Sequence, residues 1–91
     1  MVEALVQAGV ELGLPKDIAR GLAAQTCAGA GKMLVPFNDP QDLKKKVTSP
    51  GGTTEAGLKV LEDNNFRHLI KLAVQRAASR AEQLGKEADG L

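Results

Sequence analysis

The segment from Ser49 to Thr54 is the part of the chain whose residue types could do chemistry. Its sequence is Ser-Pro-Gly-Gly-Thr-Thr, and helical patterns flank it on both sides. Two adjacent glycines allow a positive φ and a close approach of the backbone to a ligand. Behind them, Thr53 and Thr54 would open a helix whose first amide N–H groups have no intrahelical acceptors. Such a helix start attracts anions, because free donors and the positive end of the helix dipole lie together.

The surrounding residues limit which anion this segment could hold. No lysine follows the glycines and the spacing is not that of a Walker A loop, which argues against nucleotide phosphates. No base or nucleophile is paired with the segment, which argues against a hydrolase. A small carboxylate fits the donors best, and the alternative is a plain turn with a threonine cap. His68 has no partner at catalytic or metal-binding spacing, so we predict a surface position for it and no metal site.

Helical periodicity dominates the sequence and predicts an all-α fold of about five helices. Gly13 is placed to stop the first helix, Pro15 suits the first turn of the second, and Asp39 can cap the third with Pro40 at its first position. Gly85 is expected to end the last helix and to leave residues 86–91 as a frayed tail. The predicted helices span about 2–12, 15–34, 40–47, 55–62 (opened by Thr53 and Thr54) and 66–84.

The composition predicts one domain over residues 1–91, with a core made of small and aliphatic side chains. Apolar residues make up 43% of the chain, but Phe37 and Phe66 are its only aromatics. Elements lined with alanine and glycine must approach closely to leave no voids. Gly21, Gly29 and Gly31 therefore suggest that a neighbouring element presses on the second helix, and the alternative is that this helix is bent or frayed.

Charge and cysteine content exclude several classes of partner. The net charge is +1, and the basic run at 44–46 has no interleaved aromatics, so we interpret it as a solvated helix face and expect no nucleic-acid binding. No apolar run approaches the roughly 20 residues of a membrane span, so we expect no membrane association. Cys27 is the single cysteine, which makes an internal disulfide impossible and predicts a small buried hydrophobe in a cytoplasmic protein.

The same residues, taken in order, resemble the C-terminal dimerisation and substrate-binding domain of pyrroline-5-carboxylate reductases. Further stretches look like the family's other helices, and the similarity covers nearly the whole chain. The positions that match the family's central motif are Pro40, Leu43, Val47, Thr48, Ser49, Gly51, Gly52, Thr54, Gly57, Leu58, Leu61 and Glu62.

The resemblance implies a function and a site. The family reduces 1-pyrroline-5-carboxylate to L-proline with hydride from NADPH or NADH, and its domain interleaves with a twin as a homodimer or higher homo-oligomer. The resemblance places the substrate carboxylate on the Gly51–Gly52 loop, on the backbone of Thr53 and Thr54 and on the Thr54 hydroxyl. It also places Val47 and Ser49 beside the ring and the nicotinamide, and assigns no catalytic or cofactor-binding residue.

Three departures from the family pattern qualify this interpretation. Asn64-Asn65 replaces the pair usual before the last helix, and Lys46 stands at a position that often approaches the cofactor, so it receives no role. No Gly-x-Gly-x-x-Gly loop follows a strand, so the dinucleotide-binding domain is absent. We therefore expect a truncated or engineered fragment that binds no cofactor and is inactive alone. The alternatives are a non-enzymatic helical oligomerisation module and the C-terminal domain of another imine or β-hydroxyacid reductase.

Overall fold

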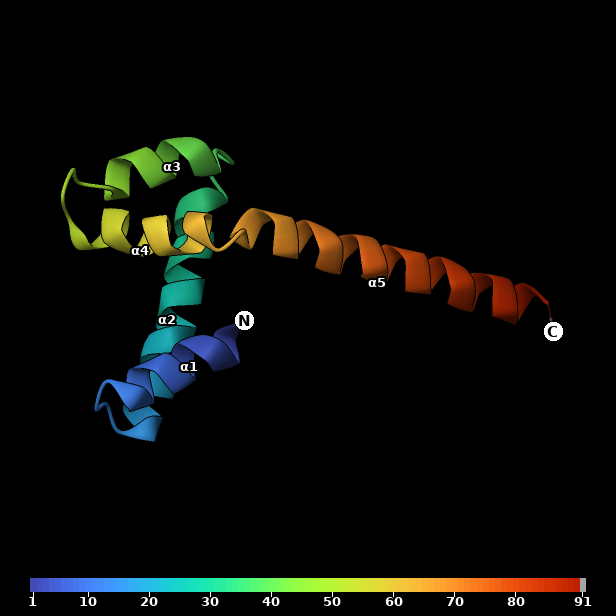
Figure 1. The fold of residues 1–91 in the computed structure, drawn as a ribbon, viewed down its shortest axis with the longest axis horizontal. Helices are drawn as coiled ribbons and strands as arrows, with labels where there is room; N and C mark the ends of the chain where they lie inside the picture. The colour runs from blue at the N-terminus through green and yellow to red at the C-terminus, as the bar shows by residue number, and fades with distance from the viewer. Residues whose placement is uncertain (91) are drawn as a thin grey trace. The chain divides into compact units, whose positions relative to one another are not determined.

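The computed structural model describes residues 1–90, in which the chain folds into helices joined by short turns (Figure 1). No strand occurs within these residues, and the expected all-α fold with five helices is confirmed. None of the helices in this range combines the length and the apolar character that crossing a membrane requires. The helices are α1 (Val2–Glu11), α2 (Lys16–Leu34), α3 (Pro40–Val47), α4 (Thr53–Asp63) and α5 (Phe66–Asp89).

The helices divide between two compact units. The first unit, Met1–Val47, contains α1, α2 and α3, and the second begins at Thr48 and contains α4 and α5. Residues 49–52, where the sequence places its chemistry, lie at the start of the second unit.

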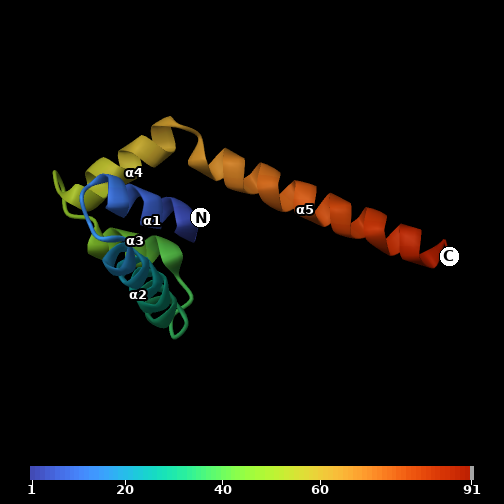
Figure 2. The same cartoon turned by 90° about the horizontal axis from the view of Figure 1, so that it is seen from below.

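In the first unit α1 packs against α2 through small residues (Figure 2). Ala19 and Ala23 are the buried hydrophobic side chains of the described residues, at 3% and 6% exposure. A Cβ added to Gly9 would lie only 3.2 Å from the Cβ of Ala19, so glycine at this position permits the close contact. Gly13, with φ +105°, ends α1 in a Schellman motif, in which the Leu14 N–H donates to the Gly9 carbonyl at 3.0 Å.

Apart from its contacts with α1 and α3, α2 is open within its unit, and this corrects one prediction. Cys27 is exposed rather than buried, because α1 covers only the side of α2 that carries Ala19 and Ala23. A Cβ added to Gly21, Gly29 or Gly31 would meet no atom within 4 Å. Within the first unit, no element presses on these glycines.

Between Gly21 and Gly31, one face of α2 consists of small residues alone. At 100° per residue, four positions spaced three or four apart lie on the side of α2 opposite Ala19. We call this face the small-residue stripe, and it is made of Gly21, Ala24, Ala28 and Gly31.

The helix starts of the first unit agree closely with the sequence. Asp39 caps α3 as predicted, because its Oδ1 accepts a hydrogen bond from the Asp42 N–H at 3.0 Å. Pro15 precedes the first turn of α2 instead of lying in it, and the helix begins at Lys16. Lys46 forms an exposed ion pair with Asp42 at 2.9 Å, which fits a solvated helix face.

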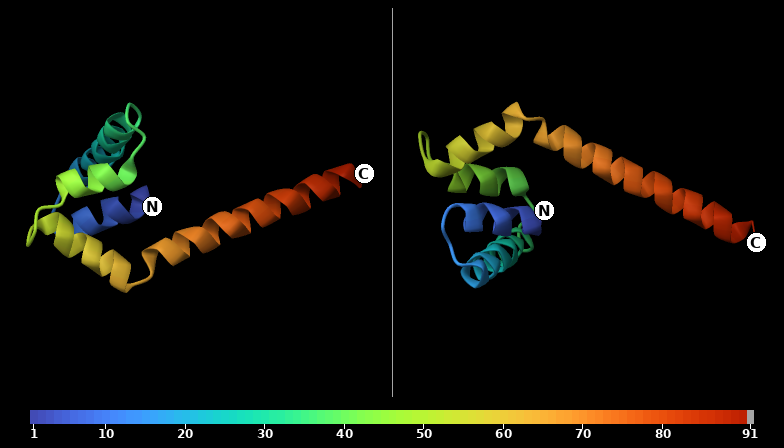
Figure 3. Two further views of the ribbon diagram at one scale, coloured as in Figure 1. Left: turned by 90° about the horizontal axis from the view of Figure 1, so that it is seen from above. Right: turned by 60° about the horizontal axis from the view of Figure 1, so that its bottom comes forward.

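In the second unit α5 is a single long helix that continues past the predicted end (Figure 3). It runs through Gly85 to Asp89, so the prediction of a frayed tail from residue 86 is wrong, while Leu91 lies outside the described residues. Two exposed ion pairs bridge the glycine, Lys86 to Glu82 at 3.4 Å and Arg80 to Glu87 at 3.5 Å. These contacts favour a continuous helix against the cost of about 1 kcal/mol that an interior glycine carries.

Candidate functional site

A tight turn precedes α4 and uses both glycines of the loop. The Gly52 N–H donates to the Ser49 carbonyl at 2.9 Å, and Gly51 has φ +73°. With Pro50 at its second position, this is a type II turn, in which the third residue needs the left-handed conformation that glycine adopts without strain. Gly52 is constrained differently, because a Cβ on it would lie 3.1 Å from the Ser49 carbonyl oxygen.

Immediately after this turn, α4 begins with unused amide donors. Gly52 is the N-cap residue, and its carbonyl accepts the first intrahelical hydrogen bond, from the Ala56 N–H at 3.2 Å. No side chain caps this end, so a threonine cap is not what the structure shows. Within residues 1–90, the amides of Thr53, Thr54 and Glu55 have no hydrogen-bond acceptor. Thr53 and Thr54 thus open the helix as predicted, with their N–H groups free at the positive end of its dipole.

The side chain of Glu55 contributes a contact that the sequence analysis missed. Its Oε1 accepts a hydrogen bond from the Gly51 N–H at 3.2 Å. A glutamate in the first turn of a helix often bonds back to the N-cap amide, and this pattern was visible in the sequence. Here the N-cap amide, on Gly52, already donates to Ser49, so Glu55 reaches one residue further. Both glycine amides are therefore engaged inside the loop.

The predicted site residues fall into two groups in the structure. Ser49, Gly51, Gly52, Thr53 and Thr54 lie together in the turn and the first turn of α4. Val47 is the last residue of α3 and belongs to the first unit, where it is half-exposed.

The other titratable side chains offer no competing site. His68 is exposed near the start of α5, as predicted. No group of three His, Cys, Asp or Glu residues within residues 1–90 could hold a metal ion. The ion pairs among the described residues are exposed, and each lies within one unit or the other.

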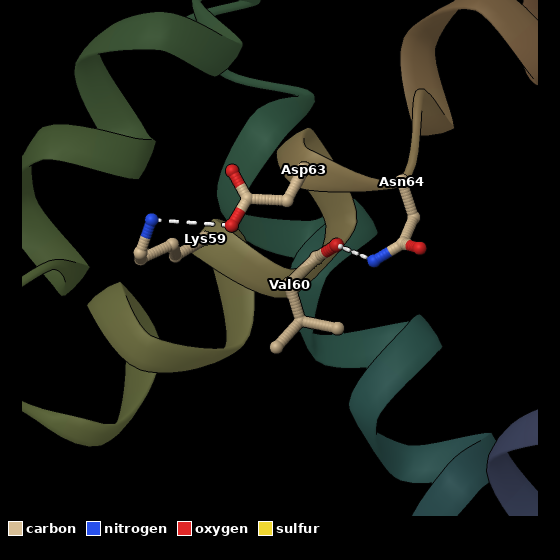
Figure 4. A network of polar contacts seen from close by, with 4 residues as sticks. All are labelled: Lys59, Val60, Asp63 and Asn64. Atoms are coloured by element: carbon tan, nitrogen blue, oxygen red, sulfur yellow. Dashed lines mark hydrogen bonds and ion pairs between the residues drawn. The ribbon is translucent and has the colours of Figure 1, made fainter.

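Further along α4, a hollow of about 320 Å³ is lined mainly by polar and acidic side chains and not by the loop. Two of its lining residues, Lys59 and Asp63, form an ion pair at 3.1 Å. Next to this pair, at the end of the helix, the Asn64 side-chain amide donates to the Val60 carbonyl at 2.7 Å (Figure 4). Three carboxylates surround the hollow, which makes it unfavourable for an anion. Its lining residues are Thr48, Glu55, Leu58, Lys59, Glu62 and Asp63.

The Asn64-Asn65 pair preserves the sharp turn into α5. Asn65 adopts the left-handed conformation, with φ +61°. Asparagine tolerates this conformation better than most residues, and glycine tolerates it best. The departure noted in the sequence therefore leaves a turn of the kind that a glycine would form.

Five helices with many exposed apolar side chains and two buried alanines define an all-α domain with little buried core of its own among the described residues. The particular family follows from comparison with known proteins. The family model described as pyrroline-5-carboxylate reductase dimerisation matches residues 1–84, and the chain belongs to this family.

Individual relatives agree with this assignment. A pyrroline-5-carboxylate reductase from Synechocystis is 48% identical over 88 residues, which cover 96% of this chain and 33% of the relative. The solved structure of a pyrroline-5-carboxylate reductase from Coxiella burnetii superposes with a TM-score of 0.84 at 44% identity, over 91% of this chain and 31% of that one. A Plasmodium falciparum pyrroline carboxylate reductase, solved with NADP bound, superposes with a TM-score of 0.82 at 38% identity. The match covers 87% of this chain and 32% of that one. The chain spans about a third of the length of these proteins.

Proposed function

We propose that this chain is the dimer-forming and substrate-carboxylate-binding part of an enzyme that reduces 1-pyrroline-5-carboxylate to L-proline, with hydride from NADPH or NADH. The observation that carries the proposal is the free helix start at Thr53 and Thr54, behind a turn whose geometry favours glycine at both positions, in a chain of this family. The protein would act in proline biosynthesis in the cytoplasm, which suits a chain whose single cysteine is unpaired.

The substrate carboxylate would be held by the backbone. The amides of Thr53 and Thr54 and the Thr54 hydroxyl are available donors, whereas the Gly51 and Gly52 amides already have acceptors within the loop. Hydrogen bonds to a charged carboxylate are roughly twice as strong as neutral ones, and the helix dipole adds to them. In this proposal Gly51 and Gly52 shape the loop, and Ser49 and Val47 lie toward the ring of the substrate.

The dinucleotide would be held by another part of the protein. The described residues contain no strand followed by a glycine-rich loop, so they do not fit this cofactor. The present residues would contribute to catalysis by holding the substrate through its carboxylate, which places the imine carbon in a fixed position. The hydride itself comes from the cofactor, and this chain supplies binding and orientation.

We also propose that the chain associates with at least one copy of itself. Leu69, Ile70 and Leu84 of α5 are exposed, and the small-residue stripe of α2 has open space around its glycines. Faces of this kind allow two helices to approach closely. The whole chain, residues 1–91, would then act as one domain whose core is shared between copies.

A direct test of the site is a titration of the chain with L-proline, followed by the amide chemical shifts of Gly51 to Thr54. We expect shifts in these amides at millimolar ligand and none in the amides of α1. A chain that dimerises but shows no shift in the loop would favour a helical oligomerisation module without a substrate site.

Activity can be tested by placing this chain in the matching C-terminal third of the Synechocystis relative. We expect the fusion to reduce 1-pyrroline-5-carboxylate with NADPH. We expect Thr54→Ala to raise the KM for this substrate about tenfold, because it removes one hydrogen bond to the carboxylate. Thr54→Ser keeps the hydroxyl and is expected to stay near the parent KM. An unchanged KM in Thr54→Ala would remove the hydroxyl from the proposed site.

A further inference from the structure

The loop is held to its helix by one side chain whose contact has no role in the proposal above. Glu55 lies in the first turn of α4, and its carboxylate oxygen accepts the Gly51 N–H at 3.2 Å. The neighbouring Gly52 N–H donates to Ser49 at 2.9 Å. Together these two bonds fix the amides of both glycines, one from each side of the loop.

Without the Glu55 contact, one bond would define the turn. The Ser49 carbonyl and the Gly52 N–H close the type II turn itself, and the Gly52 carbonyl accepts the Ala56 N–H of α4 at 3.2 Å, but neither bond connects Gly51 to the helix. Glycine loses more conformational freedom on ordering than any other residue, so two adjacent glycines form a flexible joint unless something holds them. The hydrogen bond from Gly51 to Glu55 crosses this joint.

We propose that Glu55 is the positioning residue of the carboxylate site: its side chain holds the turn at Gly51 against α4, so that the free amides of Thr53 and Thr54 keep one geometry relative to the loop. This inference rests on the proposed function of the site. Glu55 acts through the loop and does not bind the ligand, because a carboxylate would repel a carboxylate ligand.

The same side chain brings an opposing effect. Its negative charge lies at the positive end of the α4 dipole, where an anionic ligand would bind, and like charges at close range disfavour binding. The side chain is exposed, so water and salt weaken this repulsion. We expect the ordering of the loop to outweigh it, and a glutamine at this position separates the two effects because it keeps the acceptor oxygen and removes the charge.

The experiment compares Glu55→Ala and Glu55→Gln in the 91-residue chain and in the Synechocystis fusion. In Glu55→Ala we expect the Gly51 amide to exchange with solvent several-fold faster, L-proline to bind about fivefold more weakly, and KM to rise by the same factor with a smaller change in kcat. In Glu55→Gln we expect Gly51 exchange near the parent rate, and affinity equal to or tighter than that of the parent.

A matched control comes from the other end of the same helix. Glu62 is exposed and pairs with Arg67 at 3.5 Å, so Glu62→Ala removes one negative charge from α4 without touching the loop. It is expected to leave Gly51 exchange and KM unchanged. Circular dichroism of each variant checks that the helices are retained.

Two results would overturn the inference. One is parent-like Gly51 exchange and L-proline affinity in Glu55→Ala. The other is a glutamine variant as weak as the alanine variant, because the charge, and not the hydrogen bond to the loop, would then be responsible. If the parent chain shows no loop shifts with L-proline and the fusion has no activity, the proposed site itself is wrong and the role of Glu55 falls with it.

Discussion

Two glycine-containing regions of this chain use glycine in opposite ways. In the loop before α4, Gly51 has a positive φ and Gly52 lies against the Ser49 carbonyl, so each glycine has a reason within the chain. In α2, Gly21 and Gly31 have helical neighbours and open space where a side chain would be. The first region is complete in one chain, whereas the second has no neighbouring element against its glycines within its own unit.

The comparison shows which glycines a single chain can explain. A glycine that is needed for a turn shows a positive φ or a close backbone atom, and both are visible in an isolated chain. A glycine that makes room for a second chain shows neither, and in a helix it costs about 1 kcal/mol relative to alanine. Replacing a glycine of α2 should therefore favour helix formation in the isolated chain and weaken association between copies. Replacing a glycine of the loop should instead disturb the turn and weaken ligand binding.

The largest expected effect is on self-association. Gly31→Leu introduces a bulky side chain into the small-residue stripe, and we expect it to weaken dimerisation about a hundredfold, which corresponds to the roughly 3 kcal/mol of overpacking in a close contact. Helix formation in the isolated chain should improve, because leucine is the better helix former. Sedimentation equilibrium measures the dimerisation constant, and circular dichroism at low concentration measures the helix content of the isolated chain.

Gly31→Ala is the control for this prediction. It gives most of the gain in helix propensity and adds only one methyl group. If Gly31→Leu dimerises as tightly as the parent, the small-residue stripe is not an interface, and the contrast between the two regions disappears.

A smaller effect is expected in the loop. Gly52→Ala places a Cβ 3.1 Å from the Ser49 carbonyl oxygen, so the turn must open or shift. We expect L-proline to bind about tenfold more weakly, because the Gly52–Ser49 hydrogen bond and the geometry of the following amides are both disturbed. Chemical-shift titration measures the affinity.

Gly57→Ala, five residues further along α4, is the matched substitution for the loop variant. A Cβ there meets no atom within 4 Å, so we expect it to stabilise α4 slightly and to leave the L-proline affinity unchanged. Equal losses of affinity in both variants would mean that the loop glycine has no special role in binding.

The smallest effect is expected at Lys46, whose contact is local and exposed. Its ion pair with Asp42 spans one turn of α3, and such pairs contribute about 0.5 kcal/mol or less. Lys46→Ala should therefore shift the free energy of urea unfolding by no more than this, and the shift should shrink in high salt. A changed KM for NADPH in the Synechocystis fusion would instead assign Lys46 to the cofactor.

The parts of the structure that depend on neighbouring residues in sequence could be predicted. The turn at Pro50-Gly51, the start of α4 at Thr53 and the Asp39 cap each follow from a few adjacent residues, and each is present. The Glu55 contact could have been found from the same local chemistry, since a glutamate in the first turn of a helix commonly bonds backward.

The predictions that are wrong concern features that depend on packing or on residues further away in the sequence. Cys27 lies in an apolar run, which favoured burial, but the run exceeds what α1 alone can cover. Gly85 predicts the end of α5, yet two charged pairs span this glycine and the helix continues for four more residues. No pattern within one sequence determines which surface packs on the small-residue stripe.

Ala19 and Ala23 are the buried core of the described chain, and two alanines bury very little apolar surface. Ordering a chain of this length costs far more conformational entropy than such burial returns. In the proposed assembly, association supplies the missing stabilisation, so we expect the melting temperature to rise with protein concentration. Dilution is then expected to lower the melting temperature, and so is a mutation that weakens the contact between copies.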